Sequence, residues 1–419
     1  MLGIKVSYLS AKIGLPFEKE QPMDYQDLVS EAHKHQDDLI KVRRELHQIP
    51  EFGLDLPQTL AVVLREVGDL GEVTLGKDMT AASILIRGSQ PGPTVLLRAD
   101  MDALAVNEDT GLDFSSTNGY MHACGHDLHI AMGIGAARLV AANKDKLKGN
   151  VIMFFQPGEE GHDGAGVMLS QNMHMVSGEK PIAAYGLHVF SQGKSGVFSS
   201  KKDTMMASAG DMYVTIKGRG GHGSMPWNAK DPVTGMVEIL SSVQSFIAKN
   251  FDALDPIVLN VGWIKAGNDH TTNIVPEEVS FGATVRSFSK KGYEDTRTLI
   301  PNFITKMAEA MGLTAEVSFS PATKVLINDH AAIDRVERVA KSMFSEARYQ
   351  TMPQPIPGGE DFASIVEEIP GAFVFLGAAY PNTPENELQA NHSNKAKYDD
   401  SVLADGAALL AALAFDVLG

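Results

Sequence analysis

Five side chains with metal-binding or catalytic chemistry are gathered between residues 122 and 129. They are His122, Cys124, His126, Asp127 and His129. Thiolate and imidazole are the natural protein ligands of zinc and of neighbouring transition metals. An aspartate next to a ligating histidine can hold that imidazole in one tautomer. The segment therefore predicts a metal site. A cysteine nucleophile activated by His122 or His126 is the enzymatic alternative, and a capped loop is the structural one.

Carboxylate pairs follow two apolar runs. Asp100 and Asp102 come just after residues 94–97, and Glu159 and Glu160 follow a later run. Adjacent carboxylates disfavour each other's ionisation unless a cation lies nearby. A metal pair removes this difficulty, because one carboxylate can ligate while its neighbour accepts a proton from water. The alternatives are turn capping at the first pair and an exposed acidic turn at the second.

A further candidate, His188, ends the apolar run 183–187. A lone histidine is more often structural than a ligand. His188 is a candidate metal ligand only because the other strand-end groups accompany it. Open α/β sheets place ligand sites at the carboxyl ends of their strands. The pattern predicts that thiol, imidazole and carboxylate groups converge on one edge of a sheet.

The elements that must position these groups alternate along the chain. Nearly continuous apolar runs are typical of strands that are covered on both faces. Predicted strands are 83–86, 94–97, 151–155, 183–187 and 372–376, and predicted helices are 25–46, 58–67, 128–142, 164–171, 331–345 and 401–417. This alternation predicts an α/β domain with a mixed, largely parallel sheet.

A different pattern occupies residues 206–320. Predicted strands are 213–217, 257–265, 279–286 and 314–319, and predicted helices are 232–249 and 293–311. The order strand–helix–strand–strand–helix–strand is expected of a small ferredoxin-like α+β domain. We expect a discontinuous metal-binding catalytic domain of residues 23–205 and 321–419, an inserted domain of 206–320 and an N-terminal extension of 1–22.

Charge and cysteine usage restrict the class of protein. The 52 acidic and 36 basic residues give a formal charge of −16, which argues against nucleic acid as a partner and gives no attraction to anionic membranes. No run reaches the roughly 18 apolar residues of a membrane span. The single cysteine excludes an internal disulfide and fits the reducing cytoplasm.

Eight motifs occur in an order that resembles a known enzyme family. They are LLRADMDAL, MHACGHD, FFQPGEEG, GLHV, GRGGHGSMP, NIVPEEVSFGATVRS, PGGEDFA and NHS, and the resemblance extends over residues 42–418. Together they resemble the two-metal amidohydrolases that include hippurate hydrolase, bacterial N-acyl-amino-acid aminoacylases and plant auxin-conjugate hydrolases, a branch of the carboxypeptidase G-type metallopeptidases. The resemblance implies two divalent ions per subunit. Zinc suits the thiolate and imidazole ligands, with manganese, cobalt or nickel as alternatives.

The resemblance also implies a set of metal ligands. They are Cys124, His126, Glu160, His188 and His392. Glu159 is implied to be the general base, which later protonates the leaving amine. Asp102 and Asp127 are interpreted as orienting residues. The role of Asp100 stays open, because the broader group has a ligating histidine at its position. The motif around His392 departs from the family pattern at Asn394 and Ala396, where proline and an aromatic residue are usual.

Substrate contacts follow from the same resemblance. Asn273 and Arg286 match positions that grip the substrate near its scissile bond and its carboxylate, and a guanidinium suits a carboxylate because of its planar fork of donors. Gly358 and Gly359 are implied to present backbone N–H groups to that carboxylate. His222, in the inserted domain, is implied to reach the developing oxyanion, often across a dimer interface.

The function implied is metal-dependent hydrolysis of the amide bond of N-acyl amino acids, which are small molecules. The inserted domain is implied to act as a lid and as the contact of a homodimer. A dipeptidase or carboxypeptidase of the same metal chemistry, and a cysteine amidase that uses Cys124, are the alternative enzymes. A non-catalytic binding or metal-storage protein is disfavoured by the presence of Glu159.

Overall fold

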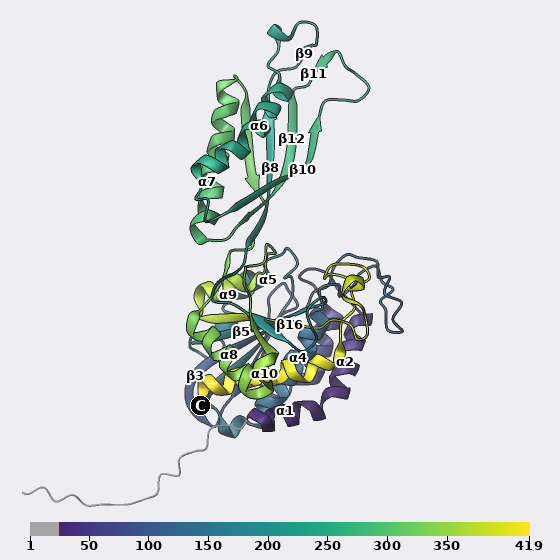
Figure 1. The fold of residues 1–419 in the computed structure, drawn as a ribbon, viewed down its shortest axis with the longest axis vertical. Helices are drawn as coiled ribbons and strands as arrows, with labels where there is room; N and C mark the ends of the chain where they lie inside the picture. Colours follow the sequence, from purple (N-terminus) through teal and green to yellow (C-terminus); the bar gives the residue numbers. More distant parts are fainter. Residues whose placement is uncertain (1–24) are drawn as a thin grey trace, which may run out of the picture.

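The computed structural model describes residues 25–419, so the expected extension of residues 1–22 lies outside the described residues. Figure 1 shows a broad α/β body from which a long, narrow second body rises. Two short strands, β7 (Asp203–Met206) and β14 (Leu326–Asn328), bracket the narrow body in the sequence and pair with each other.

An eight-stranded sheet organises the broad body, in the order β1-β2-β4-β3-β5-β16-β6-β15. Its strands are β1 (Glu72–Leu75), β2 (Ala82–Arg87), β3 (Gln90–Asp100), β4 (Lys148–Gln156), β5 (Ala183–Phe190), β6 (Phe198–Ser200), β15 (Tyr349–Thr351) and β16 (Gly371–Gly377). The central strands β4, β3, β5 and β16 are parallel, whereas β2 pairs antiparallel with β1 and β4, and β6 with β16. The predicted mixed, largely parallel sheet is confirmed.

Helices cover both faces of this sheet, which explains the continuous apolar runs of its strands. On β3, Val95 and Leu97 belong to one apolar cluster and Leu96 to the cluster on the opposite face. The first cluster includes side chains from α1 (Tyr25–Lys34), α2 (Gln36–Gln48), α3 (Pro57–Val67), α4 (His126–Ala142), α8 (His330–Phe344) and α10 (Leu403–Leu418). The second includes α5 (Gly164–Ser170) and α9 (Phe362–Glu368).

The segment Asp400–Leu418, which contains α10, is the one described helix long and apolar enough to cross a membrane, and 83% of it is buried. Its side chains pack on α4 and on the central strands of the sheet. A helix that is apolar all round and surrounded by protein is a core helix.

One predicted helix is two helices. The prediction of a single helix over residues 25–46 is wrong at His35, where α1 ends and α2 begins. The N–H of His35 bonds to the Ala32 carbonyl oxygen at 2.9 Å, the three-residue spacing of a tightened last turn. The apolar residues keep a helical spacing across this turn, so periodicity alone did not reveal it.

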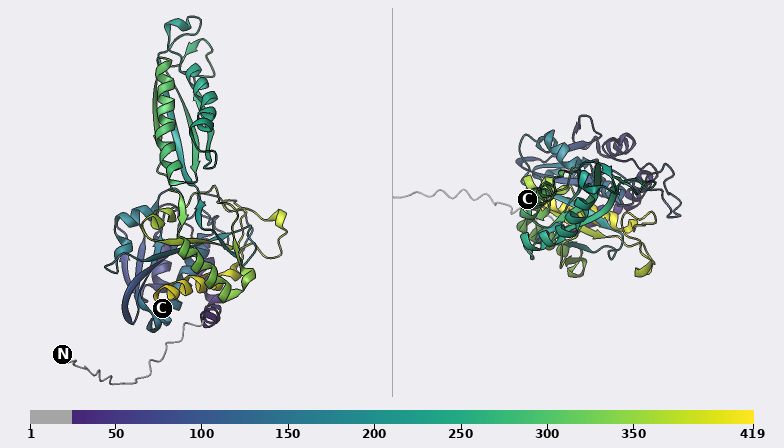
Figure 2. Two further views of the ribbon diagram at one scale, coloured as in Figure 1. Left: turned by 60° about the vertical axis from the view of Figure 1, so that its left-hand side comes forward. Right: turned by 90° about the horizontal axis from the view of Figure 1, so that it is seen from above.

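The narrow body contains a four-stranded antiparallel sheet in the order β10-β12-β8-β13. Its strands are β8 (Ser208–Lys217), β10 (Ile257–Ala266), β12 (Glu278–Ser287) and β13 (Thr314–Phe319). Helices α6 (Pro232–Asn250) and α7 (Lys290–Ala310) cover one face of it (Figure 2). This is the predicted ferredoxin-like arrangement, with β10 and β13 at the edges. A short pair, β9 (Gly221–His222) with β11 (Ile274–Val275), forms the far tip (Figure 1).

Candidate active site

Most of the predicted site residues meet at the carboxyl edge of the central parallel strands. Glu159 and Glu160 follow β4, and His188 lies near the end of β5. Cys124 and His126 flank Gly125 at the start of α4, and His392 comes from the loop before α10. Gly125 has φ +85°, and a side chain there would clash, because an added Cβ would lie 2.4 Å from Val189 Cγ2.

The donor atoms of these residues form overlapping groups. Cys124 Sγ lies 3.4 Å from His188 Nε2 and 3.2 Å from His392 Nε2. Three sets each have ligand atoms within 4.8 Å of one another: Cys124 with His126 and His188, Cys124 with Glu160 and His392, and His126 with Glu159 and Glu160. Because the thiol belongs to two sets, Cys124 would be a ligand candidate in both of them.

A further observation shows that these residues fit a pair of divalent metal ions. His126 Nε2 and Glu160 Oε1 are buried and have no hydrogen-bond partner in the described structure. Glu160 Oε1 does lie 3.2 Å from His392 Nε2, and His126 Nε2 lies 3.4 Å from Asp100 Oδ2, but both are ion pairs outside hydrogen-bond geometry. Buried polar atoms without partners are costly, and coordination of a zinc-type ion would satisfy both.

The turn that carries both glutamates is held by Asp102. Its two carboxylate oxygens each accept a backbone N–H at 2.9 Å, one from Glu159 and one from Glu160. Its carbonyl oxygen accepts a hydrogen bond from His126 Nδ1 at 2.8 Å, which leaves Nε2 of that ring for a ligand. Asp102 therefore orients the base candidate and two ligand candidates together.

Asp127 was expected to hold the imidazole of a ligating histidine, but it contacts other residues. Its Oδ2 lies 2.7 Å from His47 Nδ1 and 2.9 Å from Arg43 Nε. No described hydrogen bond joins it to the ring of His126 or of another predicted ligand. Asp127 thus braces the buried side of α4 against α2.

Electrostatics separate the two adjacent glutamates. Burial raises the pKa of Glu159 well above its usual range, and the charges of Glu360 and Glu160 add to the effect. Burial acts on Glu160 in the same direction, but its contacts with His392 and His126 outweigh it and lower the pKa. The pKa of His392 is raised to about 10, chiefly by its contacts with Cys124 and Glu160. His392 would have to lose its Nε2 proton to serve as a metal ligand, so metal binding here would release protons.

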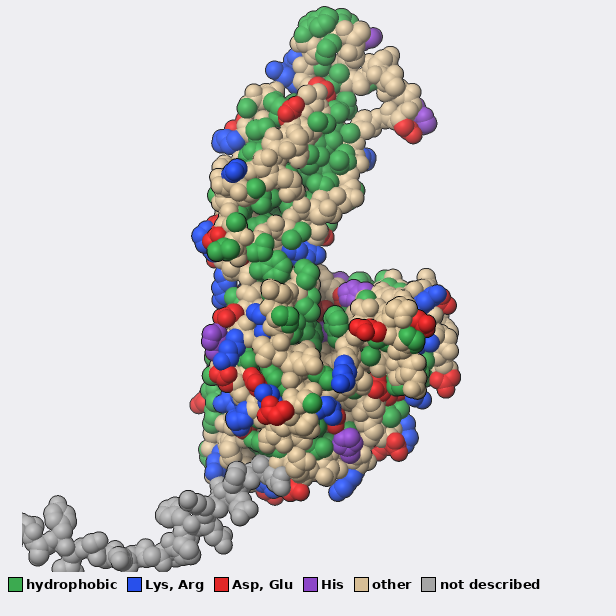
Figure 3. Space-filling model, in the orientation of Figure 1, with side chains coloured by type: hydrophobic (Ala, Val, Ile, Leu, Met, Phe, Trp, Pro, Cys, Tyr) green, Lys and Arg blue, Asp and Glu red, His purple; other side chains and the backbone are tan. Residues whose placement is uncertain are grey.

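A pocket of about 620 Å³ opens beside these groups, between the two bodies. Figure 3 shows the hollow between them on one face of the molecule. Arg286, Gly358 and Gly359 line it together with four of the ligand candidates, Cys124, Glu160, His188 and His392. The half-buried guanidinium of Arg286 donates to the carbonyl oxygens of Val285 and Gly210, at 3.0 and 3.4 Å, and is in none of the ion pairs of the described residues. Its charge is available to an anionic ligand.

Two predicted site residues lie elsewhere. His222 and Asn273 are exposed residues at the tip of the narrow body (Figure 1), and neither lines the pocket. They lie close to each other, because His222 pairs with Ile274 and the Asn273 carbonyl oxygen accepts the Gly223 N–H at 2.8 Å. The structure groups these two residues together and away from the pocket.

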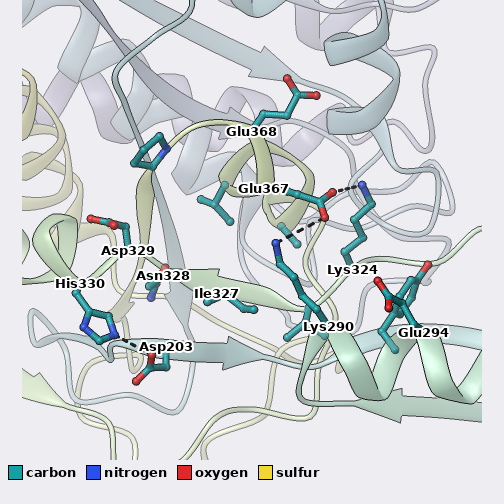
Figure 4. Close-up of a pocket in the computed structure, with 15 residues that line it drawn as sticks. Asp203, Lys290, Glu294, Lys324, Ile327, Asn328, Asp329, His330, Glu367 and Glu368 are labelled. Carbon is teal, nitrogen blue, oxygen red and sulfur yellow. Dashed lines mark hydrogen bonds and ion pairs between the residues drawn. The ribbon is translucent and has the colours of Figure 1, made fainter.

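A second cavity, of about 570 Å³, lies between α7 and α9. Its charged side chains are largely paired with one another, as Figure 4 shows. Lys290 and Lys324 both contact Glu367, and His330 Nε2 lies 2.7 Å from Asp203. None of the metal-donor groups found among the described residues includes a residue that lines it.

Sequence reasoning missed a buried charge cluster beneath the site. Arg98 is 1% exposed and donates to Asp100 at 2.8 Å, Glu360 at 2.8 Å and Asp361 at 2.9 Å. It also donates to Gln156 at 3.0 Å. The available signal was an arginine at the end of an otherwise apolar strand, in LLRAD, together with the acidic pair of GGEDFA.

Comparisons with known proteins agree with this geometry. The chain is 33% identical over 393 residues to thermostable carboxypeptidase 1 of Saccharolobus solfataricus, covering 92% of this chain and 97% of that one. It is 35% identical over 344 residues to the N-acetyl-L-cysteine deacetylase of Bacillus subtilis, covering 81% and 80%.

A solved structure is similar over nearly the whole chain. It is the Bacillus subtilis YXEP protein, described as a dinuclear metal-binding peptidase of the M20 family, with a TM-score of 0.76 and 28% identity over 92% of this chain and 99% of that one. The model of peptidase family M20/M25/M40 matches residues 96–416. This protein belongs to peptidase family M20/M25/M40.

Proposed function

We propose that this protein hydrolyses the amide bond of N-acyl amino acids and releases a carboxylic acid and an amino acid. The proposal rests on the contents of one pocket. The buried carboxylate of Glu159 lies there beside a cluster of metal donors, and so does Arg286, which is in none of the described ion pairs. The cluster suits attack on an amide, and Arg286 suits the free carboxylate of the amino acid. One relative is named as an N-acetyl-L-cysteine deacetylase, and removal of that acetyl group breaks an amide bond.

The ligand set that we propose is Cys124, His126, Glu160, His188 and His392. When bound, two divalent ions would supply Lewis acidity and lower the pKa of water; thiolate and imidazole favour zinc, with manganese, cobalt or nickel as alternatives. Glu159 would take the proton of the attacking water and return it to the departing amine. Gly358 and Gly359 would present N–H groups to the substrate carboxylate beside Arg286.

His222 and Asn273 enter this scheme only if another subunit supplies them. We propose a homodimer in which the inserted domain, residues 206–320, brings the tip of one subunit to the pocket formed by the catalytic domain, residues 23–205 and 321–419, of the other. The exposed edge strand β10 offers a surface for two-fold pairing. His222 would then stabilise the oxyanion, and closure of the inserted domain would exclude water.

Mixed dimers test the contribution in trans. Glu159→Gln and His222→Ala subunits should each be nearly inactive alone, the latter by about 10²–10³ in rate. After subunit exchange, a mixed dimer contains one site with both residues intact, and activity should return in part. No recovery after confirmed exchange would show that His222 does not act across the interface.

The substrate class is tested by a cleavage screen. N-acetyl, N-benzoyl and fatty-acyl amino acids should be hydrolysed, and the corresponding amides without a carboxylate should not, because Arg286 would lack its partner. Zinc, manganese, cobalt and nickel contents are measured on the same sample. The screen also contains dipeptides, since similarity to a carboxypeptidase favours that second candidate. Faster cleavage of dipeptides than of every acyl amino acid would overturn the first proposal in favour of the second.

The remaining alternative is a cysteine amidase. Cys124 is buried, with its sulfur near two histidines, but this alternative gives no role to Glu159 and Glu160.

We propose a cytoplasmic location, because the lone thiol fits a reducing compartment.

A further inference from the structure

The backbone of Val189 connects two of the proposed metal ligands. The ladder between β3 and β5 ends at the pair Arg98–Gly186, three residues before Val189. Side chains take over both backbone groups of Val189. Its N–H donates to His129 Nε2 at 2.8 Å, and its carbonyl oxygen accepts His188 Nδ1 at 2.8 Å.

The same carbonyl oxygen accepts a second hydrogen bond, from Asn391 Nδ2 at 3.0 Å. Asn391 Nδ2 also lies 3.2 Å from the carbonyl oxygen of Cys124. In the sequence, Asn391 immediately precedes His392. The ring of His188 is fixed with its proton on Nδ1, which turns Nε2 toward the Cys124 sulfur. One peptide group therefore holds one ligand directly and the loop of another through an amide side chain.

The hydrogen bonds of His129 determine where its proton lies. A backbone N–H can only donate, so His129 Nε2 must carry a lone pair. The ring proton is then on Nδ1, which lies 2.6 Å from Asp100 Oδ1. Both nitrogens are occupied, so this ring has no donor atom left for a metal, even though it lies near His126 and Asp100.

We propose that His129 is a positioning residue of the metal centre. Through Val189 it holds the ring of His188 and, through Asn391, the loop that carries His392. Asp100 fixes the tautomer of His129 and is itself held by Arg98 Nη1 at 2.8 Å. The inference rests on the metal ligands of the proposed function, and it gives Asp100 the role that the sequence left open.

Two isosteric variants separate the two contacts of the ring. His129→Asn places an amide near Nδ1, so it keeps a donor to Asp100 and loses the acceptor for Val189. His129→Gln places an amide oxygen near Nε2, so it keeps the acceptor and loses the donor. Zinc affinity is measured on the full-length, zinc-loaded proteins by transfer to a chelating dye. His129→Asn should bind zinc roughly 10- to 100-fold more weakly, the range for loss of an outer-shell partner, and His129→Gln should stay closer to the wild type.

A matched control is His174→Gln, because His174 is also a buried histidine but lies next to Met173, which belongs to the apolar cluster on the other face of the sheet. Its zinc affinity should equal that of the wild type. In His129→Asn, kcat for an N-acyl amino acid should fall with little change in KM, because Arg286 and the glycines are untouched. Asn391→Ala tests the contact between Val189 and the loop that carries His392, and the Asn391 side chain is partly exposed. Because this loop is then held less firmly, one of the two zinc ions should be released more easily.

The outcomes separate the inference from the proposed function. Wild-type protein that binds two zinc ions, with His129→Asn and Asn391→Ala binding them equally well, would overturn the inference alone. Equal losses in His129→Asn, His129→Gln and His174→Gln would also overturn it, because that pattern reports general packing. A wild-type protein that binds no zinc would overturn the proposed function and this inference with it.

Discussion

Arg98 allows the most quantitative prediction. Its guanidinium is the cation shared by the carboxylates of Asp100, Glu360 and Asp361, and all four side chains are at most 1% exposed. Arg98→Met keeps a similar volume and removes the charge. Breaking a buried ion pair by deleting one partner costs about 3–5 kcal/mol, because the remaining charges are left without compensation.

The local pKa values place the expected cost within that range. Burial raises the pKa of Glu360 to about 8 and that of Asp361 to about 6, so at pH 7 Glu360 is already largely protonated. Asp100, whose pKa is held well below its usual range by Arg98 and by His126 and His129 against the effect of burial, stays charged. Two carboxylates rather than three lose their cation, and we expect the lower half of the range, about 3–4 kcal/mol.

Denaturant unfolding of the metal-free protein, followed by far-ultraviolet circular dichroism, measures this cost. Fluorescence is unsuitable, because both tryptophans, Trp227 and Trp263, belong to the narrow body. The control is Arg87→Met, which breaks an exposed pair with Glu72 and should scarcely move the midpoint. The loss for Arg98→Met should shrink at pH 5, where Asp361 also becomes protonated. Equal midpoints for Arg98→Met and Arg87→Met would refute the reasoning.

Three further predictions concern the site. Glu159→Gln keeps size and loses the proton acceptor, so turnover should fall by roughly 10²–10⁴; unchanged turnover at full metal content would remove Glu159 from the mechanism. Cys124→Ser should weaken metal binding, because an alcohol is a poorer ligand than a thiolate; full occupancy by elemental analysis would contradict this. Glu360 has a pKa raised from 4.5 to about 8 in the folded protein, so its contribution to stability is complete below pH 4.5 and is lost as pH rises through 8. Metal-free Glu360→Gln should therefore show a flatter unfolding midpoint between those pH values, and an unaltered pH dependence would refute the assignment.

The fold could be predicted where strands are covered on both faces, because continuous apolar runs then mark them. The short strands β1 and β15 were not predicted, because they do not have such runs. All four residues of β1 are exposed, and β15 has only three residues, so neither forms a continuous apolar run. The ferredoxin-like order of the narrow body could be predicted because alternating burial and helical periodicity are strong there.

The candidate site could be predicted where chemistry is concentrated in one segment or at one strand end. Cys124, Glu160 and His188 are of this kind. His392 was found only by resemblance, since its loop reads as polar sequence. The bond from Arg98 to Glu360 joins residues 262 positions apart, and no periodicity in one sequence reports such a contact. The position of His222 depends on assembly, which one chain does not specify.

Zinc titration of the chelator-stripped protein tests the central claim most directly. Amide cleavage of an N-acyl amino acid and the free thiol of Cys124 are measured on the same samples. The account predicts no cleavage in metal-free protein with its thiol intact, and activity that rises with added zinc to a plateau at two equivalents per chain. Full cleavage without metal, abolished by alkylation of Cys124, would contradict it and favour a cysteine amidase.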